Sequence, residues 1–462
     1  MSISRLELGS LKKWALQTRR KPLIIRGARQ VGKSTLVNLL AQQTHLDLLT
    51  LNFEQQPELA DLFARPDPKK ILKLLEVQIN RPIHIGKTLL FLDEIQGVAK
   101  VILPALRYFY EEIPDLHVIS TGSLLDFALN EAQFSMPVGR IEYLFMGPLN
   151  FEEFLIALGE QSLWAFLNEF QINDILPQSI HNRLMDLLRE FLIIGGMPEA
   201  VAAFAENRDY QSAERIKHAI LNTYRDDFNK YSTPTSHNRI RKVFSALPAL
   251  VGKRLKYSLI SPDEKSVVIA NALEKLCLAR VAYLIKHSAC NGLPLGAQVN
   301  EKIFKPLFLD VGLVCTSLGL NLLDIGVANT LSLVNSGAIS EQFIGQHLLY
   351  LHPSYQEPAL YYWVREKKSS SAEVDYVINI GPNILPIEVK AGKSGTLRSL
   401  HYFLQEQSLH LGVRVNAHFP QITAEKVTLA GDRSLQYQLL SLPLYFIGQL
   451  KRLISNTIGM LL

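Results

Sequence analysis

Residues Gly27 to Ser34 read Gly-Ala-Arg-Gln-Val-Gly-Lys-Ser and match the phosphate-binding pattern G-x-x-x-x-G-K-[ST]. In this pattern the glycines let backbone N–H groups turn inward around phosphate oxygens, the lysine reaches the β- and γ-phosphates, and the hydroxyl binds Mg²⁺. The apolar run Pro22–Ile25 precedes the pattern and the helix-forming run Thr35–Leu40 follows it, which directs the positive end of a helix at the phosphates. The predicted nucleotide contacts are Gly27, Ala28, Arg29, Gln30, Val31, Gly32, Lys33, Ser34 and Thr35.

Two adjacent carboxylates stand where nucleotide hydrolysis needs them. The apolar run Thr88–Leu92 predicts a buried strand, and Asp93 and Glu94 follow directly at its end. We expect Asp93 to hold Mg²⁺ through its water shell and Glu94 to orient and polarise the attacking water. The alternative is a strand that ends in two acids without a catalytic role. The phosphate-binding pattern upstream favours hydrolysis, with ATP and Mg²⁺ as cofactors.

Further groups could act on the γ-phosphate. The next predicted strand ends in hydroxyl residues, of which Thr121 or Ser123 would sense the γ-phosphate or hold the water, although a plain turn at a strand end fits equally. Phosphoryl transfer also gains from a cation on the developing charge. Arg140 is the leading choice for that cation, ahead of Arg107 and Arg29, and the alternative for each is a surface salt bridge.

A second set of chemical groups lies near the C-terminal end. Asp375 followed by Glu388-Val-Lys390 has the form D…E-x-K of metal-dependent endonucleases. Asp375 and Glu388 on adjacent strands could converge on Mg²⁺, which prefers oxygen ligands. Lys390 projects on the same strand face as Glu388 and could activate water or stabilise a phosphate. Glu341, on a preceding helix, would complete the metal site. The alternative is strands that end in charged residues with no catalytic role.

The overall composition is that of a globular protein. The chain has 462 residues, 48% of them hydrophobic and 20% charged, which suits about two to four domains. The net charge of +5 permits a nucleic-acid partner without proving one. The three cysteines lie far apart, which argues against disulfides and zinc. The first residues lack the pattern of a signal peptide, and the apolar tail from Leu439 is interrupted by charges. We therefore expect a cytoplasmic protein without membrane insertion.

The order of strand-like and helical runs predicts the domains. Residues 1–150 alternate between the two, with strands expected at Leu23–Ile25, Leu46–Leu51, Leu89–Leu92 and Leu116–Ser120, which indicates an α/β domain with a parallel sheet. Residues 151–235 are helical and would form a lid or connector, broken once at Gly195-Gly196. Residues 236–300 resemble a winged helix, but the apolar stretch in Lys265–Leu276 makes a poor DNA reader.

Residues 301–462 form the last predicted domain, of the α+β class. Its expected strands are Tyr361–Arg365, Val374–Ile378 and Ile384–Val389, and its expected helices are Ile339–Tyr350 and Ser399–Glu406.

The motifs together resemble a known group. The stretches Gly27–Thr35, Phe91–Glu94, Ser120–Ser123, Val138–Arg140 and Pro148–Leu155 are similar, in that order, to prokaryotic AAA-type ATPases of the archaeal-ATPase-like kind, which are related to STAND NTPases. Phe191–Glu199, Phe304–Leu313 and Glu373–Ile378 resemble the later parts of the same family, so the resemblance covers nearly the whole chain. It implies an ATP-binding AAA-like core followed by a C-terminal domain related to restriction-endonuclease-like folds.

Three functions remain open from the sequence. The leading hypothesis is an AAA-like ATPase that passes its nucleotide state to the C-terminal domain, as a homo-oligomer if Arg140 acts across a subunit boundary. The second is an ATP-regulated, metal-dependent nuclease acting on DNA or RNA. The third is a nucleotide-dependent switch or scaffold with little turnover.

Overall fold

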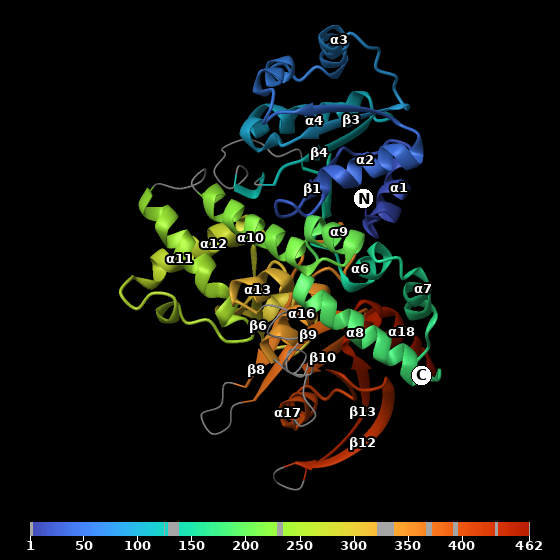
Figure 1. Cartoon of the computed structure of the whole chain (residues 1–462), viewed down its shortest axis with the longest axis vertical. Coiled ribbons are helices and arrows are strands. Elements are labelled where there is room, and N and C mark those ends of the chain that lie inside the picture. Colours follow the sequence, from blue (N-terminus) through green and yellow to red (C-terminus); the bar gives the residue numbers. More distant parts are fainter. Residues whose placement is uncertain are drawn as a thin grey trace. The chain divides into compact units, whose positions relative to one another are not determined.

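The protein is described here by a computed structural model that covers residues 3–123, 125–127, 138–228, 234–320, 337–365, 372–390, 396–429 and 433–461 (Figure 1). The chain forms two compact units. The first unit contains Met1–Pro148 together with two later segments, Lys275–Val281 and His352–Glu357. The second unit contains Leu149–Glu274, Ala282–Leu351 and Pro358–Leu462. The main segment of the first unit thus ends next to the domain boundary expected at residue 150.

The first unit is built on a parallel sheet with the strand order β2-β3-β4-β1-β5. The strands are β1 (Leu23–Arg26), β2 (Asp47–Asn52), β3 (Thr88–Asp93), β4 (His117–Thr121) and β5 (Glu142–Phe145). The helices are α1 (Glu7–Ala15), α2 (Lys33–Thr44), α3 (Pro68–Ile79) and α4 (Ala99–Glu112), with 3₁₀ turns η1 (Pro57–Phe63) and η2 (Ile95–Val98). The four strands expected from the sequence are confirmed, and β5 is an addition.

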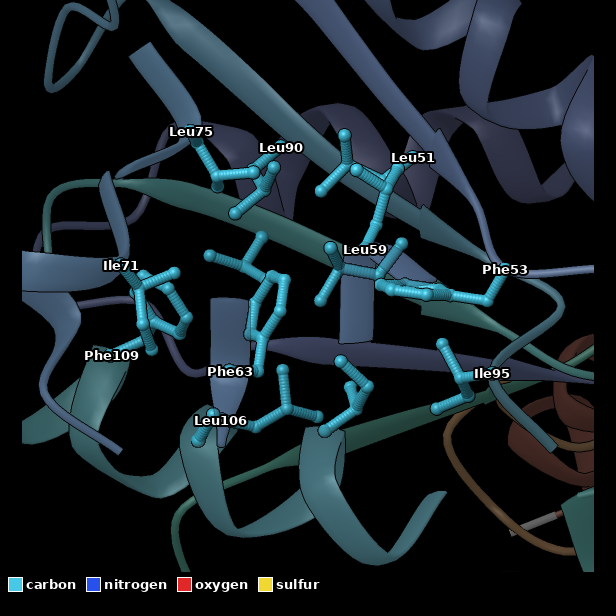
Figure 2. Close-up of a cluster of buried hydrophobic side chains, with 14 of the residues drawn as sticks. Leu51, Phe53, Leu59, Phe63, Ile71, Leu75, Leu90, Ile95, Leu106 and Phe109 are labelled. Atoms are coloured by element: carbon cyan, nitrogen blue, oxygen red, sulfur yellow. The ribbon is translucent and has the colours of Figure 1, made fainter. Parts of the chain in front are cut away.

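Burial of apolar side chains holds this sheet in place. Every residue of β3 is buried, which is the pattern expected of a central parallel strand. Figure 2 shows the main cluster, where side chains of β2, β3, η1, α3, η2 and α4 meet. Its labelled members are Leu51, Phe53, Leu59, Phe63, Ile71, Leu75, Leu90, Ile95, Leu106 and Phe109. The cluster fixes the carboxyl end of β3, where Asp93 and Glu94 lie.

The second unit begins with helices and ends with a mixed sheet. The helices are α6 (Phe151–Ala157), α7 (Gln161–Glu169), α8 (Gln178–Ile194), α9 (Pro198–Asn207), α10 (Tyr210–Asp227), α11 (Pro234–Leu250), α12 (Ser266–Leu278, which runs into the first unit), α13 (Val311–Ser317), α16 (Gly337–Leu349), α17 (Arg398–Glu406) and α18 (Leu450–Leu461). Short 3₁₀ turns are η4 (Tyr257–Leu259), η5 (Leu295–Gln298) and η6 (Leu444–Gln449).

The sheet of the second unit has eight strands in the order β12-β13-β11-β10-β9-β8-β6-β7. They are β6 (Ala282–Ser288), β7 (Val299–Phe308), β8 (Tyr361–Val364), β9 (Glu373–Ile380), β10 (Asn383–Val389), β11 (Leu411–Asn416), β12 (Gln421–Leu429) and β13 (Arg433–Pro443). β6 pairs with β7 on one side and with β8 on the other. β6 and β7 therefore belong to the eight-stranded sheet and do not form the separate wing of a winged helix. The winged helix expected for residues 236–300 is not confirmed, and neither is the restriction-endonuclease-like nature of the last domain.

A buried carboxylate joins two distant motifs of the second unit. Asp310 is fully buried, and its Oδ2 accepts a hydrogen bond of 2.7 Å from the Gly196 N–H while its Oδ1 accepts one of 3.1 Å from the Leu313 N–H. The Leu149 N–H donates to the Gly196 carbonyl at 2.7 Å. A Cβ at Gly196 would lie 2.0 Å from the Leu149 carbonyl oxygen, so only glycine fits. At the break predicted at Gly195-Gly196, the backbone therefore packs against Leu149 and against Asp310 at the start of α13.

A buried histidine fixes the start of α6. Asn150 and Glu153 form a capping box at this helix end, and the Phe151 N–H donates to His347 Nε2 at 2.9 Å. His347 Nδ1 lies 2.7 Å from the Phe343 carbonyl, so the ring is neutral with the proton on Nδ1. Burial lowers the pKa of His347 to about 4.

No helix in the described part of the chain is both long enough and apolar enough to cross a membrane. The interrupted apolar tail instead packs on the second unit through Leu450, Leu453 and Ile454 of α18, all buried.

Candidate nucleotide-binding site

The phosphate-binding pattern lies between β1 and α2, as the sequence predicts. β1 ends at Arg26, the loop follows, and α2 begins at Lys33. Gly32, the residue before the helix, has φ +93°, which a residue with a side chain rarely adopts. This conformation turns the first N–H groups of α2 toward the loop, as phosphate binding at a helix N-terminus requires.

Lys33 points into the loop. Its Nζ donates to the carbonyls of Ala28 at 2.8 Å and Gly27 at 3.1 Å. Burial lowers the pKa of Lys33, and with Glu94 and Asp93 opposing the shift it lies at about 8. The side chain is therefore mostly charged at neutral pH, and its positive charge faces the two carboxylates at the end of β3.

The residues predicted to hold Mg²⁺ contact each other. Ser34 Oγ donates to Asp93 Oδ2 at 3.0 Å. Asp93 Oδ1 accepts hydrogen bonds from Thr121 Oγ1 and, at 3.1 Å, from the Glu94 N–H. A hydroxyl and a carboxylate are the oxygen ligands that Mg²⁺ takes in phosphate-binding loops, so these residues fit the ion. When bound, Mg²⁺ would neutralise charge on the β- and γ-phosphates.

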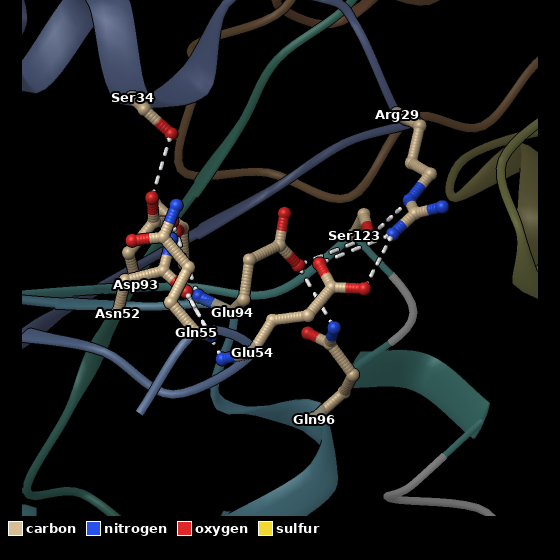
Figure 3. Close-up of polar contacts among 10 residues, drawn as sticks. Arg29, Ser34, Asn52, Glu54, Gln55, Asp93, Glu94, Gln96 and Ser123 are labelled. Atoms are coloured by element: carbon tan, nitrogen blue, oxygen red, sulfur yellow. Dashed lines mark hydrogen bonds and ion pairs between the residues drawn. The ribbon is translucent and has the colours of Figure 1, made fainter. Parts of the chain in front are cut away.

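Glu94 is held beside this pair by neutral donors. Gln96 Nε2 donates to Glu94 Oε2 at 2.8 Å, and Ser123 Oγ donates to the same oxygen at 3.3 Å (Figure 3). Glu94 also has φ +54°, which is uncommon for a residue other than glycine. Strain of this kind clusters at functional sites. Gln96, two positions after Glu94, is a residue that the sequence analysis missed, although its place beside the acidic pair was visible.

Arg29, in the phosphate-binding loop, lies next to Ser123, which also contacts Glu94. Its Nε lies 3.4 Å from Ser123 Oγ, and its Nη2 lies 3.5 Å from both carboxylate oxygens of Glu54 (Figure 3). The structure therefore gathers Arg29, Ser34, Asp93, Glu94, Thr121 and Ser123, which come from three separate stretches of sequence, at the carboxyl edge of the sheet.

Arg140 does not share this arrangement. Its Nε donates to Glu111 Oε1 at 2.9 Å, and its side chain is 44% exposed. Arg107 pairs with the same carboxylate oxygen at 3.1 Å. Both arginines thus form the surface salt bridges that were their alternative interpretation, and a catalytic role for Arg140 remains a prediction.

A second charged network lies next to the loop within the first unit. Asp126 accepts from Arg26, which directly precedes the loop, and from Arg280 Nε at 2.8 Å. Arg280 also pairs with Glu357 at 2.9 Å, and its guanidinium lies 4.8 Å from the centre of the Phe145 ring. Arg280 and Glu357 belong to the two late segments of this unit. The network therefore joins the start of the loop to residues that lead into and out of the second unit.

The predicted C-terminal residues also meet, around a lysine that the sequence analysis did not single out. Lys305 Nζ in β7 lies 2.6 Å from Glu373 Oε1, 3.5 Å from Glu341 Oε2 and 3.8 Å from Asp375 Oδ1. Glu388 Oε1 pairs with Lys390 Nζ at 2.6 Å. We call Lys305, Glu341, Glu373, Asp375, Glu388 and Lys390 the acidic centre. The sequence signal for Lys305 was a charged residue inside an apolar strand.

The charges of the acidic centre perturb one another. Burial alone would lower the pKa of Lys305, but Glu341, Asp375 and Glu373 raise it above its ordinary value. Burial and the nearby Asp375 raise the pKa of Glu341 to about 8 and that of Glu388 to about 7. Across the described ranges, no three or more His, Cys, Asp or Glu side chains are arranged to hold a metal ion. The metal ligation predicted for Asp375, Glu388 and Glu341 is thus without a matching ligand set here.

Comparison with known families defines the class of the first unit. Residues 19–155 match a family model described as an AAA domain. The chain therefore contains a P-loop AAA-type ATPase domain, as the loop and the parallel sheet indicate. Residues 185–324 and 336–436 match two domains of unknown function, DUF8612 and DUF4143. A comparison with curated proteins gave no match.

Similar solved structures include three proteins, all at low identity. The ORC2 protein of Aeropyrum pernix is 11% identical over 70% of this chain and 96% of its own, with a TM-score of 0.35. The RuvB Holliday junction branch migration motor of Thermotoga maritima is 13% identical over 61% and 89%, with a TM-score of 0.28. A STAND protein with a tetratricopeptide repeat sensor from Pyrococcus horikoshii is 13% identical over 75% and 48%, with a TM-score of 0.25. The class assignment rests on the family match and the loop, since these scores are low.

Proposed function

We propose that this protein is a Mg²⁺-dependent ATPase that couples its nucleotide state to the second unit. The observation that carries the proposal is the contact of Ser34 with Asp93 beside the Lys33 ammonium, with Glu94 held next to them. Gly27 to Thr35 bind the phosphates, and Ser34 and Asp93 hold Mg²⁺. Thr121 fixes Asp93 through a hydrogen bond, and Ser123 supports Glu94.

Glu94 acts as the general base in this proposal. It orients a water molecule and accepts its proton while the water oxygen attacks the γ-phosphorus. The bond from that phosphorus to the bridging β–γ oxygen breaks, and ADP and phosphate leave. The ammonium of Lys33 and the N–H groups at the start of α2 stabilise the negative charge that builds up on the phosphate oxygens.

Nucleotide binding is tested first with Lys33→Ala. We expect this variant to lose binding of a fluorescent ATP analogue, because the cation at the β- and γ-phosphates is gone. Lys100→Ala, at an exposed position in α4 of the same unit, is the matched control and keeps wild-type binding. Equal binding by Lys33→Ala and wild type would remove the proposal.

Coupling to the second unit is supported by the network around Asp126. Arg26 contacts Asp126 and leads directly into the loop, while Arg280 contacts Asp126 and lies two residues before the start of β6. A shift of the loop between nucleotide states would therefore act on the segment that enters the eight-stranded sheet.

Arg140 would complete the ATPase only from a second copy of the chain, since within its own copy it pairs with Glu111. A homo-oligomer with Arg140 acting across the subunit boundary predicts that mixing inactive Arg140→Ala with inactive Lys33→Ala restores part of the activity. No recovery in the mixture, with both variants folded, contradicts this arrangement.

Metal-dependent cleavage of DNA or RNA is the second candidate function, and it requires a metal ion to displace the ion pairs that Lys305 makes in the acidic centre. Its support is the convergence of Asp375, Glu388, Lys390 and Glu341 in the acidic centre. It predicts cleavage with Mg²⁺ or Mn²⁺ that disappears in Asp375→Ala and in Lys390→Ala. Intact DNA and RNA after incubation with protein, metal and ATP would contradict it.

A further inference from the structure

The acidic centre contains its own cation. Lys305 is 1% exposed, and its Nζ lies within 4 Å of the carboxylates of Glu341, Glu373 and Asp375. The ring of Tyr362 lies 5.2 Å from the same nitrogen, so its π-face adds to the attraction. A buried ammonium is stable only when it is paired, and three carboxylates supply that pairing. Lys305 is therefore fixed where these carboxylates converge.

Most of the remaining oxygens in the centre are bound to protein donors. Glu373 Oε2 accepts from Arg254 Nε at 2.9 Å, Asp375 Oδ2 from the Val389 N–H at 2.8 Å, and Glu388 Oε1 from Lys390 Nζ at 2.6 Å. Glu388 Oε2 is buried and has no hydrogen-bond partner among the described residues. Three cationic side chains, Lys305, Lys390 and Arg254, thus face four carboxylates. The centre carries little uncompensated charge without any metal ion.

A divalent ion would have to displace these partners. Mg²⁺ takes oxygen ligands at about 2.0–2.1 Å in near-octahedral geometry, so it needs several carboxylate oxygens that are free to point at one place. Here Glu373 and Asp375 are turned toward Lys305, Arg254 and the Val389 N–H. An ion bound among them would also lie close to the Lys305 ammonium, and like charges repel strongly at short range in a buried site. The residues present therefore do not fit the metal that the endonuclease-like resemblance implies.

We propose that Lys305 is the resident cation of the acidic centre and keeps divalent metal ions out of it. The centre is then held together by ion pairs that join α16, β7 and β9, and by the hydrogen bond from the Val389 N–H of β10 to Asp375 in β9. While Lys305 stays in place, these carboxylates do not form a metal-dependent catalytic site. This proposal is independent of the ATPase assignment, since all residues concerned lie in the second unit.

Mn²⁺ binding to the full chain without nucleotide tests the proposal, read as the loss of the free-ion signal in electron paramagnetic resonance. We expect wild type and Asp375→Asn to bind the same amount of Mn²⁺. Any ion held by Asp93 or by the surface is present in both proteins and does not affect this comparison. Lys305→Met removes the charge and keeps the chain length. It should bind one additional Mn²⁺, and Lys305→Met combined with Asp375→Asn should lose it again.

Two controls and the outcomes that would overturn the proposal complete the test. Lys305→Arg keeps the positive charge and should bind no additional Mn²⁺. If Lys305→Met is unfolded in metal-free buffer, its thermal melting is followed during a Mn²⁺ titration, and recovery of a folded transition supports the proposal. A Mn²⁺ ion that wild type binds and Asp375→Asn loses overturns it, as does a folded Lys305→Met that binds no additional ion.

Discussion

Ser34 Oγ lies 3.0 Å from Asp93 Oδ2, although the two residues are 59 positions apart. The contact exists because α2 starts and β3 ends at the same edge of the parallel sheet, and Thr121 at the end of β4 holds Asp93 from the other side. Strands with the same direction bring their carboxyl ends together, which is where ligands bind in open α/β sheets. The site is thus a consequence of strand order as much as of motif.

Gln96 is predicted to position Glu94 rather than to bind nucleotide. A hydrogen bond to a charged group contributes about 1.5–3 kcal/mol, so Gln96→Ala should lower kcat by about 10- to 100-fold with little change in the KM for ATP. Gln55→Ala is the control, because Gln55 is exposed and the variant keeps the backbone N–H that donates to Asn52 Oδ1 at 3.0 Å. A raised KM with unchanged kcat would assign Gln96 to binding instead.

Arg280 is predicted to stabilise the first unit. Removing one partner of a buried ion pair costs about 3–5 kcal/mol, and the lower end applies to Arg280→Met because Asp126 keeps Arg26. Arg81→Met breaks an exposed pair with Asp47 in the same unit and should cost less than about 1 kcal/mol. Denaturant unfolding of both variants measures the difference, and equal losses contradict the role given to Arg280.

Gly196→Ala is predicted to destabilise the second unit. The added Cβ would lie 2.0 Å from the Leu149 carbonyl oxygen, so the backbone must move and strain the bond from Gly196 to Asp310. We expect a loss of about 1–3 kcal/mol or more in the free energy of unfolding. Gly337→Ala, where a Cβ meets nothing within 4 Å, is the control and should be neutral. Wild-type stability for Gly196→Ala would contradict the packing described here.

His347 is predicted to make stability fall in mild acid. Its folded pKa of about 4 lies below the ordinary value, so the unfolded chain binds the proton more readily. The contribution is complete above about pH 6.5 and is lost as the pH falls toward about 4, by about 3 kcal/mol in all. Chemical denaturation at several pH values in this range gives the free energy of unfolding as a function of pH. This free energy should fall less steeply with falling pH for His347→Gln than for wild type. The same pH dependence in both proteins would show that His347 is not responsible.

The sequence predicted the parts of the fold whose signal is local. The four apolar runs of the first sheet are confirmed as β1 to β4, of which β1, β3 and β4 are almost wholly buried and β2 is buried at two of its six residues. β5 (Glu142–Phe145) was missed, and its first two residues are only partly buried. β11 to β13 were missed as well, and β12 has a partly exposed pattern along most of its length. Their pairing is set by distant partners rather than by their own composition.

The sites divide in the same way. The loop and the Asp93–Glu94 pair were each predicted from a short local pattern, because the residues within each pattern act together and are adjacent in sequence. Gln96 and Lys305 were missed, since their roles depend on which side chains the folded sheets bring near them. Arg140 was predicted from the sequence as a catalytic cation, but in the folded chain it pairs with Glu111, a contact that depends on the fold rather than on the sequence around Arg140.

The rate of phosphate release from ATP with Mg²⁺, compared between wild type and Glu94→Gln at equal nucleotide occupancy, tests the central claim most directly. Loss of a general base lowers the rate by about 10²- to 10⁴-fold. We expect Glu94→Gln to bind ATP like wild type and to show a loss of that size. Equal rates for the two proteins would contradict the account and favour a nucleotide-dependent switch with little turnover.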